Sequence, residues 1–365
     1  MQNLNCTDYS SEEAVGLLTT YRCNLRCKYC YIQEKKDLNI TLEMAQSLLE
    51  PFLLKHAGLL SIIFMGGETL LAMDVICPLV EWVEANHWNR PYRFFGSTNG
   101  TLLTEDKKKW VTKHRDIITL GLSYDGIPEI QISNRGNDRI DIDYFLHTWP
   151  KQPIQMTINE ESVKQMANGV IYLLEKGAMV HPNVAYEKKE WSKDSIIEYG
   201  KQLNYLIYYY SHHPEKPLVS QFIHNLCEYA DNIVDHKEQR EICSAGDGFQ
   251  VFDIDGKSYP CHLLSPLVLK GNKLQEVCSG LITEKTIFAD TKCRKCPYTT
   301  SCPTCIGCNF LYRDALNIRD NTHCDIMKTE VKAFIKMEVL RLKAKNTITS
   351  EDASEIDAII KLLSV

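Results

Sequence analysis

The chain alternates short apolar runs with amphipathic stretches through its first half. Each run has the length of a buried strand, and the stretches between the runs repeat apolar residues at helical spacing. The expected strands are Val15–Thr20, Leu60–Met65, Tyr92–Ser97, Ile117–Leu122, Ile154–Ile158 and a sixth near Ala178–Ala185. Strands that alternate with helices predict a parallel sheet or a barrel.

The first helix shows the pattern between strands. Thr41 can cap its N-terminus, and the apolar positions Ala45, Leu48, Leu49 and Phe52 follow at i, i+3, i+4 and i+7. A second helical stretch begins at Leu70.

After about residue 190 the pattern changes to longer helices and a loop-rich, cysteine-rich segment. The expected elements are helices over 193–211 and 217–235, a hairpin from Phe249 to Cys261 around Asp255–Gly256, a helix from Asp325 to Lys345, and a C-terminal helix capped by Ser350 with an apolar stripe of Ile356, Ile359, Ile360 and Leu363. Tyrosines 205, 208, 209 and 210 can line a channel, but ordinary helix packing explains them better.

Polar and glycine motifs follow the first four strands. They are the cysteine loop, Gly66–Gly67–Glu68, Thr98–Asn99–Gly100 and Ser123–Tyr124–Asp125–Gly126. Because the active site of a parallel barrel lies at the carboxyl ends of its strands, these motifs predict one shared site.

Composition narrows the class of protein. The 365 residues carry a net charge of −6, without the basic excess that favours a nucleic-acid partner. No apolar run reaches the ~18 residues of a membrane helix, and Met1–Tyr9 lacks a signal-peptide pattern. We therefore expect a soluble cytoplasmic protein. Its 15 cysteines then indicate metal or redox chemistry rather than disulfides.

Three of these cysteines form a compact motif, Cys23-x3-Cys27-x2-Cys30. A [4Fe–4S] cluster usually has four cysteine ligands, so three would leave one iron open to a bound molecule. Spacing alone leaves two alternatives, a partial zinc site and a cluster with a distant fourth ligand.

The motif, with Tyr29 just before its third cysteine, resembles the signature of the radical S-adenosylmethionine (SAM) superfamily. The resemblance implies that the open iron binds the amino and carboxylate groups of SAM. One electron then breaks a carbon–sulfur bond, and the resulting 5′-deoxyadenosyl radical abstracts a hydrogen atom from the substrate. It also implies an external electron donor such as flavodoxin or ferredoxin.

The later motifs match the same family in order. Gly66-Gly67-Glu68 resembles the Gly-Gly-Glu motif near the SAM amino group, although Thr69 replaces the usual proline. Ser123-x-Asp125-Gly126 resembles the motif after the fourth strand, and Arg135 follows the serine at the family spacing. The residues expected to contact SAM are Tyr29, Gly66, Gly67, Glu68, Asn99, Ser123, Asp125 and Arg135.

The C-terminal cysteines resemble a SPASM domain, the auxiliary-cluster domain of peptide- and protein-modifying members. By that pattern the ligands of the distal cluster would be Cys293, Cys296, Cys302 and Cys324. Cys243 and Cys261 would ligate the proximal cluster, together with Cys305 or Cys308 or both, and Cys278 is a spare candidate. Zinc sites are the alternative reading of this region. Cys6, Cys77 and Cys227 fit no pattern and are expected to be buried thiols.

The sequence therefore predicts an α/β protein. A partial (β/α)6 TIM-like radical SAM barrel over residues 10–235 precedes a small cysteine-rich iron–sulfur SPASM domain over 236–330 and C-terminal helices over 331–365. Too few residues precede Cys23 for a separate leader-peptide-binding domain, so none is expected. The motifs assign no catalytic base.

The expected function is oxidative modification, such as cross-linking, of a side chain in a ribosomally synthesised peptide. A sulfatase-maturase-like enzyme that makes formylglycine is the first alternative. Those enzymes carry an aspartate after the second hairpin cysteine, where this chain has His262. An iron–sulfur electron carrier and a zinc-stabilised binding module are the others. The partner is a peptide or protein, with no nucleic acid and no membrane.

Overall fold

The computed structural model describes residues 13–235, 243, 245, 248–280, 290–293, 295–302 and 304–364. Contacts divide the chain into two compact units. Unit 1 comprises Met1–Tyr124, Gln131–Ile154 and Ser244–Thr283, and unit 2 comprises Asp125–Ile130, Gln155–Cys243 and Glu284–Val365. These units are groups of residues in mutual contact, and each contains several separate segments of the chain. They do not test the domain bounds expected from the sequence, which stay a prediction.

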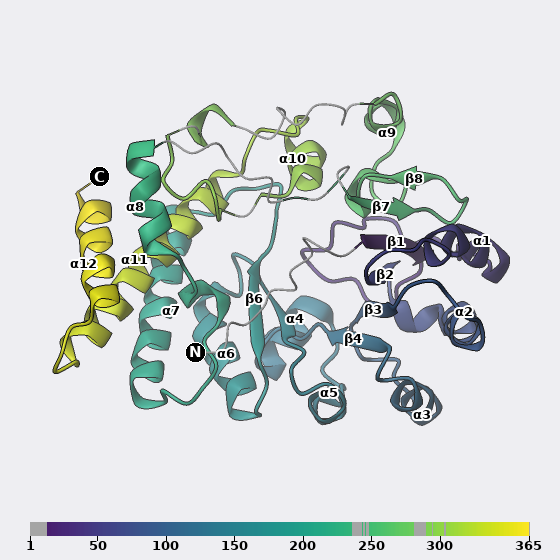
Figure 1. Cartoon of the computed structure of the whole chain (residues 1–365), viewed down its shortest axis with the longest axis horizontal. Helices are drawn as coiled ribbons and strands as arrows, with labels where there is room; N and C mark the ends of the chain where they lie inside the picture. The colour runs from purple at the N-terminus through teal and green to yellow at the C-terminus, as the bar shows by residue number, and fades with distance from the viewer. Residues whose placement is uncertain are drawn as a thin grey trace. The chain divides into compact units, whose positions relative to one another are not determined.

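Unit 1 is built on a six-stranded sheet in the order β4-β3-β2-β1-β7-β8 (Figure 1). Its strands are β1 (Glu13–Thr20), β2 (Leu60–Gly66), β3 (Tyr92–Thr98), β4 (Ile118–Leu122), β7 (Phe249–Phe252) and β8 (Ser258–Tyr259). The first four pair in parallel, as predicted, so their carboxyl ends reach one edge of the sheet.

The predicted hairpin forms, but its place in the sheet was not predicted. β7 pairs in parallel with the outer edge of β1, where Gly16 lies opposite Val251, and β8 returns antiparallel to β7. The hairpin that carries Cys261 therefore extends the same sheet that leads into Cys23.

Helices follow most of the strands and make up most of the C-terminal part of the described chain. They are α1 (Leu42–Leu53), α2 (Met73–Ala85), α3 (Glu105–Lys113), α4 (Pro128–Arg135), α5 (Ile142–Thr148), α6 (Met166–Glu175), α7 (Lys193–His212), α8 (Leu226–Asp235), α9 (Gly271–Cys278), α10 (Ile306–Arg313), α11 (Asn321–Lys343) and α12 (Ser350–Leu363). The predicted cap of α1 is confirmed, because the Thr41 hydroxyl accepts a hydrogen bond from the Met44 amide at 3.2 Å.

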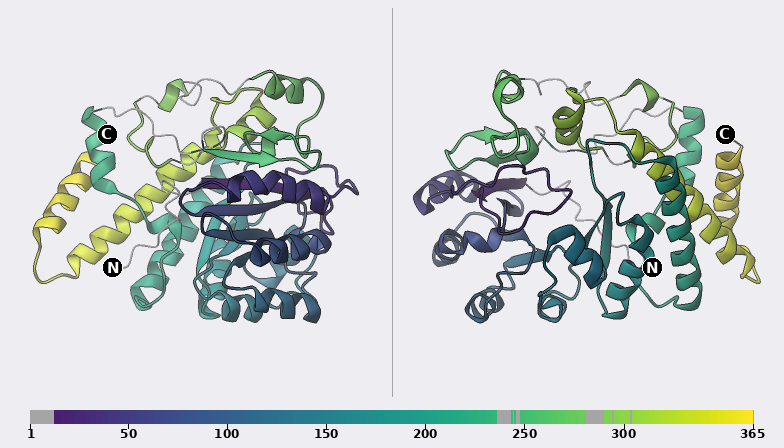
Figure 2. Two further views of the ribbon diagram at one scale, coloured as in Figure 1. Left: turned by 45° about the vertical axis from the view of Figure 1, so that its right-hand side comes forward. Right: turned by 180° about the vertical axis from the view of Figure 1, so that it is seen from behind.

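Unit 2 contains the two-stranded sheet of β5 (Ile154–Ile158) and β6 (Val180–Val184), both close to their predicted ranges. α11 packs on α7, and α12 packs on α8; the last two helices are the yellow-green and yellow ribbons of Figures 1 and 2. The predicted start of the 217–235 helix was wrong, because α8 begins only at Leu226.

The C-terminal helix corrects two further expectations. Its N-cap is Thr349, not Ser350, because the Thr349 hydroxyl and the Asp352 carboxylate form a reciprocal capping box. Of the predicted apolar stripe, Ile359 is buried, whereas Ile360 and Leu363 are 58% and 67% exposed. No described helix is long and apolar enough to cross a bilayer.

A buried carboxyl joins α7 to α11. The Tyr199 hydroxyl of α7 donates a hydrogen bond to Glu330 of α11, and burial raises the pKa of Glu330 to about 7. A carboxyl whose pKa rises on folding is most compatible with the folded state when it is protonated. Stability from this group is therefore present below pH 4.5 and is lost as the pH rises through about 7.

We predict that Glu330→Gln removes this pH dependence and stabilises the protein at pH 8 by about 3 kcal/mol. The neutral amide can still accept the Tyr199 hydrogen bond. Anaerobic urea unfolding of both proteins at pH 5.5 and pH 8, followed by circular dichroism, measures the difference. An equal offset between the two proteins at both pH values would contradict the assignment.

Candidate active site

The cysteine loop is fixed by backbone bonds from the end of β2. The Gly67 amide donates to the Thr20 carbonyl at 2.9 Å, and the Glu68 amide donates to the Arg22 carbonyl at 2.8 Å. A Cβ atom on Gly67 would lie 2.0 Å from the Arg22 carbonyl oxygen. Only glycine permits this approach, so the predicted Gly-Gly motif sets the course of the chain into Cys23.

The Glu68 side chain is used within the protein. Its carboxylate is buried and accepts hydrogen bonds from the Leu70 amide at 3.1 Å, the Asn99 amide at 2.8 Å and the Thr98 hydroxyl. Burial raises the pKa of Glu68, and these three donors oppose that shift. Glu68 therefore ties the end of β3 to the end of β2.

The carboxyl ends of β3 and β4 lie at the same end of the sheet as that of β2. The Asn99 side-chain amide donates to the Asn24 side-chain oxygen within the cysteine loop at 3.1 Å. The Ser123 amide donates to the Thr98 carbonyl at 2.9 Å. Unit 1 thus brings the motifs after β2 and β3 to the cysteine loop, and the end of β4 is bonded to the end of β3.

Arg135 meets the loop from the end of α4. Its guanidinium carbon lies 5.4 Å from the centroid of the Tyr29 ring, within the range of a cation–π contact. The neighbouring Lys28 amide donates to the Asn134 carbonyl at 3.0 Å. Two residues expected to contact SAM are therefore placed against each other.

Asp125 and Gly126 belong to unit 2 and serve packing there. The fully buried Asp125 carboxylate accepts a hydrogen bond from the Thr157 amide of β5 at 3.0 Å. Gly126 has a φ of +89°, and a Cβ atom on it would lie 2.5 Å from the Gly169 Cα. The motif therefore has a structural use besides its predicted role at SAM.

Thr69 stands where the family usually has proline, and the structure gives a reason. Its hydroxyl donates to the Ser97 carbonyl at 2.8 Å, a further bond between the ends of β2 and β3. Proline has no donor for this bond.

The three thiols of the loop are half-buried. Burial raises the pKa of Cys23, while the ammonium of Lys35 lowers it. The Lys35 ammonium also donates to the Cys30 sulfur at 3.1 Å. Three soft ligands on one loop, beside backbone that only glycine allows, fit a cluster and a small ligand bound next to it.

A second contact near the loop was missed by the sequence. The Tyr31 hydroxyl, next to Cys30, lies 3.0 Å from the His262 Nε2, next to Cys261. Burial lowers the pKa of His262 to about 4, so its ring is neutral at neutral pH. Tyr21 strengthens the junction by donating to Asp253 of the hairpin at 2.7 Å. No sequence motif predicts either pair, because each pair joins residues more than 200 positions apart.

Unit 2 gathers the four thiols predicted to hold the distal cluster. Burial, followed by the charges of Cys324 and Cys296, raises the pKa of Cys302 to about 12. Burial also raises the pKa values of Cys293 and Cys324, with Cys296 acting on both. All four thiols belong to unit 2.

Cys305 and Cys308 form a pair at the start of α10. The Cys305 sulfur accepts a hydrogen bond from the Cys308 amide at 3.4 Å, and the Cys308 side chain lowers the pKa of Cys305. Tyr186 is close enough that both thiols raise its pKa after burial, and its ring stacks on His323 at 3.8 Å. The pairing leaves open which of the two thiols is a ligand.

The remaining cysteines are dispersed. Cys261 and Cys278 lie in unit 1, whereas Cys243 lies in unit 2. Cys77 is half-buried, but Cys227 is exposed, so its expected burial was wrong. Cys6 lies outside the described residues. Within the described part of the chain, no three Cys, His, Asp or Glu side chains converge as the ligands of a single metal ion would.

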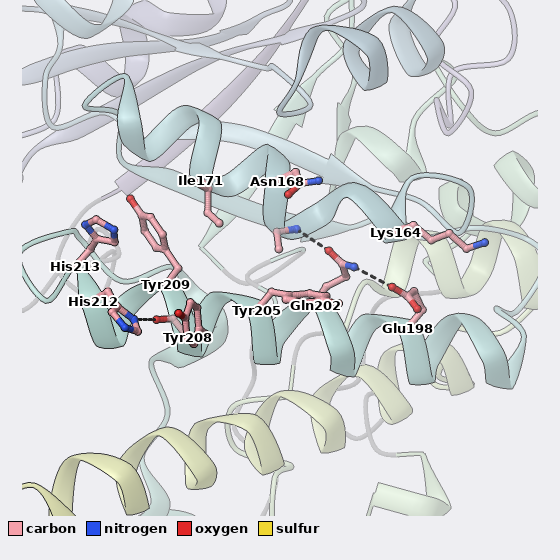
Figure 3. Close-up of a pocket in the computed structure, with 11 residues that line it drawn as sticks. Lys164, Asn168, Ile171, Glu198, Gln202, Tyr205, Tyr208, Tyr209, His212 and His213 are labelled. Carbon is pink, nitrogen blue, oxygen red and sulfur yellow. Dashed lines mark hydrogen bonds between the residues drawn. The ribbon is translucent and has the colours of Figure 1, made fainter.

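A separate groove in unit 2 contains none of the predicted site residues. It lies along α6 and α7 and has a volume of about 750 Å³ (Figure 3). Tyr205 and Tyr208 line it and are 59% and 68% exposed, whereas Tyr209 and Tyr210 are buried. Ordinary helix packing thus accounts for only half of the tyrosine cluster.

Residues 17–148 match the family model described as the Radical SAM superfamily. Among curated proteins, the chain is 26% identical over 211 residues to the Fe-coproporphyrin III synthase of Methanosarcina barkeri, covering 51% of each chain. It is also 26% identical over 124 residues to AlbA, the antilisterial bacteriocin subtilosin biosynthesis protein of Bacillus subtilis, covering 32% of this chain and 25% of AlbA.

Two solved structures share the fold over most of the chain. anSMEcpe with bound AdoMet and the Cp18Cys peptide has a TM-score of 0.65 at 19% identity, covering 92% of this chain and 100% of that one. Streptococcus suis SuiB bound to the precursor peptide SuiA has a TM-score of 0.58 at 15% identity, covering 86% of this chain and 76% of that one. At these identities the likeness shows the fold.

Residues 17–148 therefore form a radical SAM domain, as the motifs predicted. The shared fold extends beyond the matched domain into the C-terminal cysteine region, as expected for the SPASM-domain subgroup. The chain spans between a quarter and about half of the length of the curated relatives that it matches.

We predict that Gly67→Ala removes about four irons per chain, the content of one cubane, from anaerobically reconstituted protein. The added Cβ meets backbone rather than a movable side chain, so the segment that leads into Cys23 must shift. Iron analysis and the EPR spectrum of the reduced protein measure the loss.

Gly200→Ala is the matched control, because its Cβ would meet only the Thr329 methyl at 3.2 Å within α7 and α11. It should keep its full iron content. A Gly67→Ala protein with as much iron as the control would show that the loop tolerates the side chain.

Proposed function

We propose that this protein is a radical SAM enzyme that oxidatively modifies a side chain of a peptide or protein, with cross-linking of a ribosomally made peptide as the leading case. The observation that supports the proposal is the convergence on the cysteine loop of the motifs after β2 and β3 and of Arg135 from α4. AlbA, a bacteriocin biosynthesis protein, and SuiB, bound to a precursor peptide, support the choice of substrate class.

Cys23, Cys27 and Cys30 would hold a [4Fe–4S] cluster in this proposal. SAM bound there supplies a 5′-deoxyadenosyl radical once an external donor, such as flavodoxin or ferredoxin, provides one electron. Gly66 and Gly67 keep the backbone open to a small ligand, and Glu68 fixes the edge on which that ligand would lie. The Tyr29–Arg135 pair presents a cation and a ring at the same edge.

Two auxiliary clusters would occupy the C-terminal cysteines. The spacing of Cys293, Cys296, Cys302 and Cys324 and their common place in unit 2 support the distal set. Cys243, Cys261 and the Cys305–Cys308 pair stay the proposed proximal set. Removing a hydrogen atom would leave a substrate radical that must lose one electron and one proton to give a closed-shell product, and an auxiliary cluster would supply the electron acceptor.

Sulfatase-maturase-like chemistry is the first alternative, and His262 argues against it because an aspartate is expected there. A tetrapyrrole substrate is the second, because the likeness to Fe-coproporphyrin III synthase covers half of each chain.

We predict that replacing Cys23, Cys27 and Cys30 together by alanine lowers the iron content from about twelve to about eight per chain and abolishes 5′-deoxyadenosine formation. Anaerobic, dithionite-reduced protein is incubated with SAM and analysed by chromatography. Cys227→Ala, an exposed thiol outside every motif, should keep both properties. Continued SAM cleavage by the triple variant would refute the assignment, and stoichiometric zinc in the wild-type protein would favour the binding module.

We predict a loss of two hydrogens from a short peptide encoded beside the gene when it is incubated with reduced enzyme and SAM. Mass spectrometry compares that peptide with a sulfatase peptide and with iron coproporphyrin III, and the triple cysteine variant is the control. Formylglycine on the sulfatase peptide, or turnover of the porphyrin, with no change in any neighbouring peptide would transfer the assignment to the corresponding alternative.

A further inference from the structure

One cation lies directly against the predicted cluster loop. The Lys35 ammonium donates a hydrogen bond to the Cys30 sulfur at 3.1 Å. Lys35 belongs to none of the motifs after the strands, and the chemistry proposed above gives it no role. Its nearest predicted site residue in sequence is Cys30, so the contact is local to the loop.

The ammonium is fixed in this position by a second bond. It donates to the Ile32 carbonyl at 2.9 Å, and the Ile32 side chain is buried in the cluster that also contains Leu18 and Val251. A lysine side chain in water loses considerable entropy when it is held in one conformation. Two acceptors on a segment anchored in the core offset that cost and keep the charge at the sulfur.

Within the part of the chain that the structure describes, no carboxylate forms an ion pair with Lys35. Its neighbour Glu34 pairs with Lys270 instead, at the surface of unit 1. Among the described residues, the acceptors of the Lys35 ammonium are the Cys30 sulfur and the Ile32 carbonyl. One positive charge therefore lies directly against a thiol of the loop.

A cation at a ligand sulfur has a definite effect on an iron–sulfur cluster. The reduced cluster carries one more negative charge than the oxidised cluster, so a nearby cation stabilises the reduced form more. Hydrogen bonds to the ligand sulfurs act in the same direction and are among the factors that set the reduction potential.

We propose that Lys35 is a positioning residue that acts through Cys30 to raise the reduction potential of the cluster at Cys23, Cys27 and Cys30. The proposal rests on the proposed function, because it needs that cluster. Its effect is to ease the uptake of one electron from the external donor, without contact between Lys35 and the substrate.

The test is an EPR-monitored redox titration of the full-length, anaerobically reconstituted protein in the presence of SAM. The signal that changes when SAM is added reports the cluster of the loop and separates it from the auxiliary clusters. Lys35→Met should shift the midpoint potential of this signal to a more negative value, with the iron content unchanged. Lys35→Arg, which keeps the charge, should remain closer to the wild-type potential.

Lys36→Met is the matched control. It removes the same charge from the adjacent exposed position, where no contact with a cysteine is present, and should leave the potential unchanged. A wild-type potential in Lys35→Met with full iron content, or an equal shift in Lys36→Met, would overturn the proposal.

Lys35→Gln is a second neutral variant that retains a hydrogen-bond donor. Loss of about four irons in both neutral variants would overturn tuning in favour of a structural role for Lys35. A wild-type protein whose EPR spectrum does not respond to SAM would instead refute the proposed function, which makes the two failures distinguishable.

Discussion

The approach of Gly67 to the Arg22 carbonyl, which leaves no room for a Cβ atom, determines how the rest of the site is arranged. A side chain at residue 67 would overlap the Arg22 carbonyl. Residue 67 must therefore be glycine for the end of β2 to pack against the segment that follows β1. Two backbone hydrogen bonds then fix the direction in which the chain enters the cysteine loop. The Glu68 carboxylate also fixes the end of β3, because it accepts hydrogen bonds from Thr98 and Asn99.

Both groups of cysteines meet the same electrostatic problem. Thiolates gathered on a short segment repel one another, and burial disfavours each charge further. In unit 1 the Lys35 ammonium lies at the loop. In unit 2 burial raises the pKa values of Cys293, Cys302 and Cys324. The Arg319 guanidinium opposes this rise at Cys293 and Cys302, and the Lys292 ammonium opposes it at Cys324. Each group of thiols is therefore accompanied by cations from residues near it in sequence, which suits sites that bind metal as thiolates.

The errors made from the sequence have a common cause. An apolar stripe on α12 was expected to be buried as a whole, but α8 covers only part of it and leaves Ile360 and Leu363 in solvent. The helix cap moved by one residue, because Thr349 and Ser350 are equally suitable in sequence and only Thr349 reaches the Asp352 amide. Periodicity identifies a helix, but it does not specify the surface on which the helix packs.

The sequence by itself determined the strands β1 to β6, the cysteine loop and the motifs at the strand ends, because these depend on local spacing and on residue types that few structures tolerate. Only the tertiary structure decided that the Cys261 hairpin joins the edge of β1, that Tyr31 meets His262, and that Asp125 faces β5. These contacts join residues far apart in the chain, and no local preference selects them. Once the local elements have formed, a strand edge and some buried polar groups still lack hydrogen-bond partners. These contacts supply those partners.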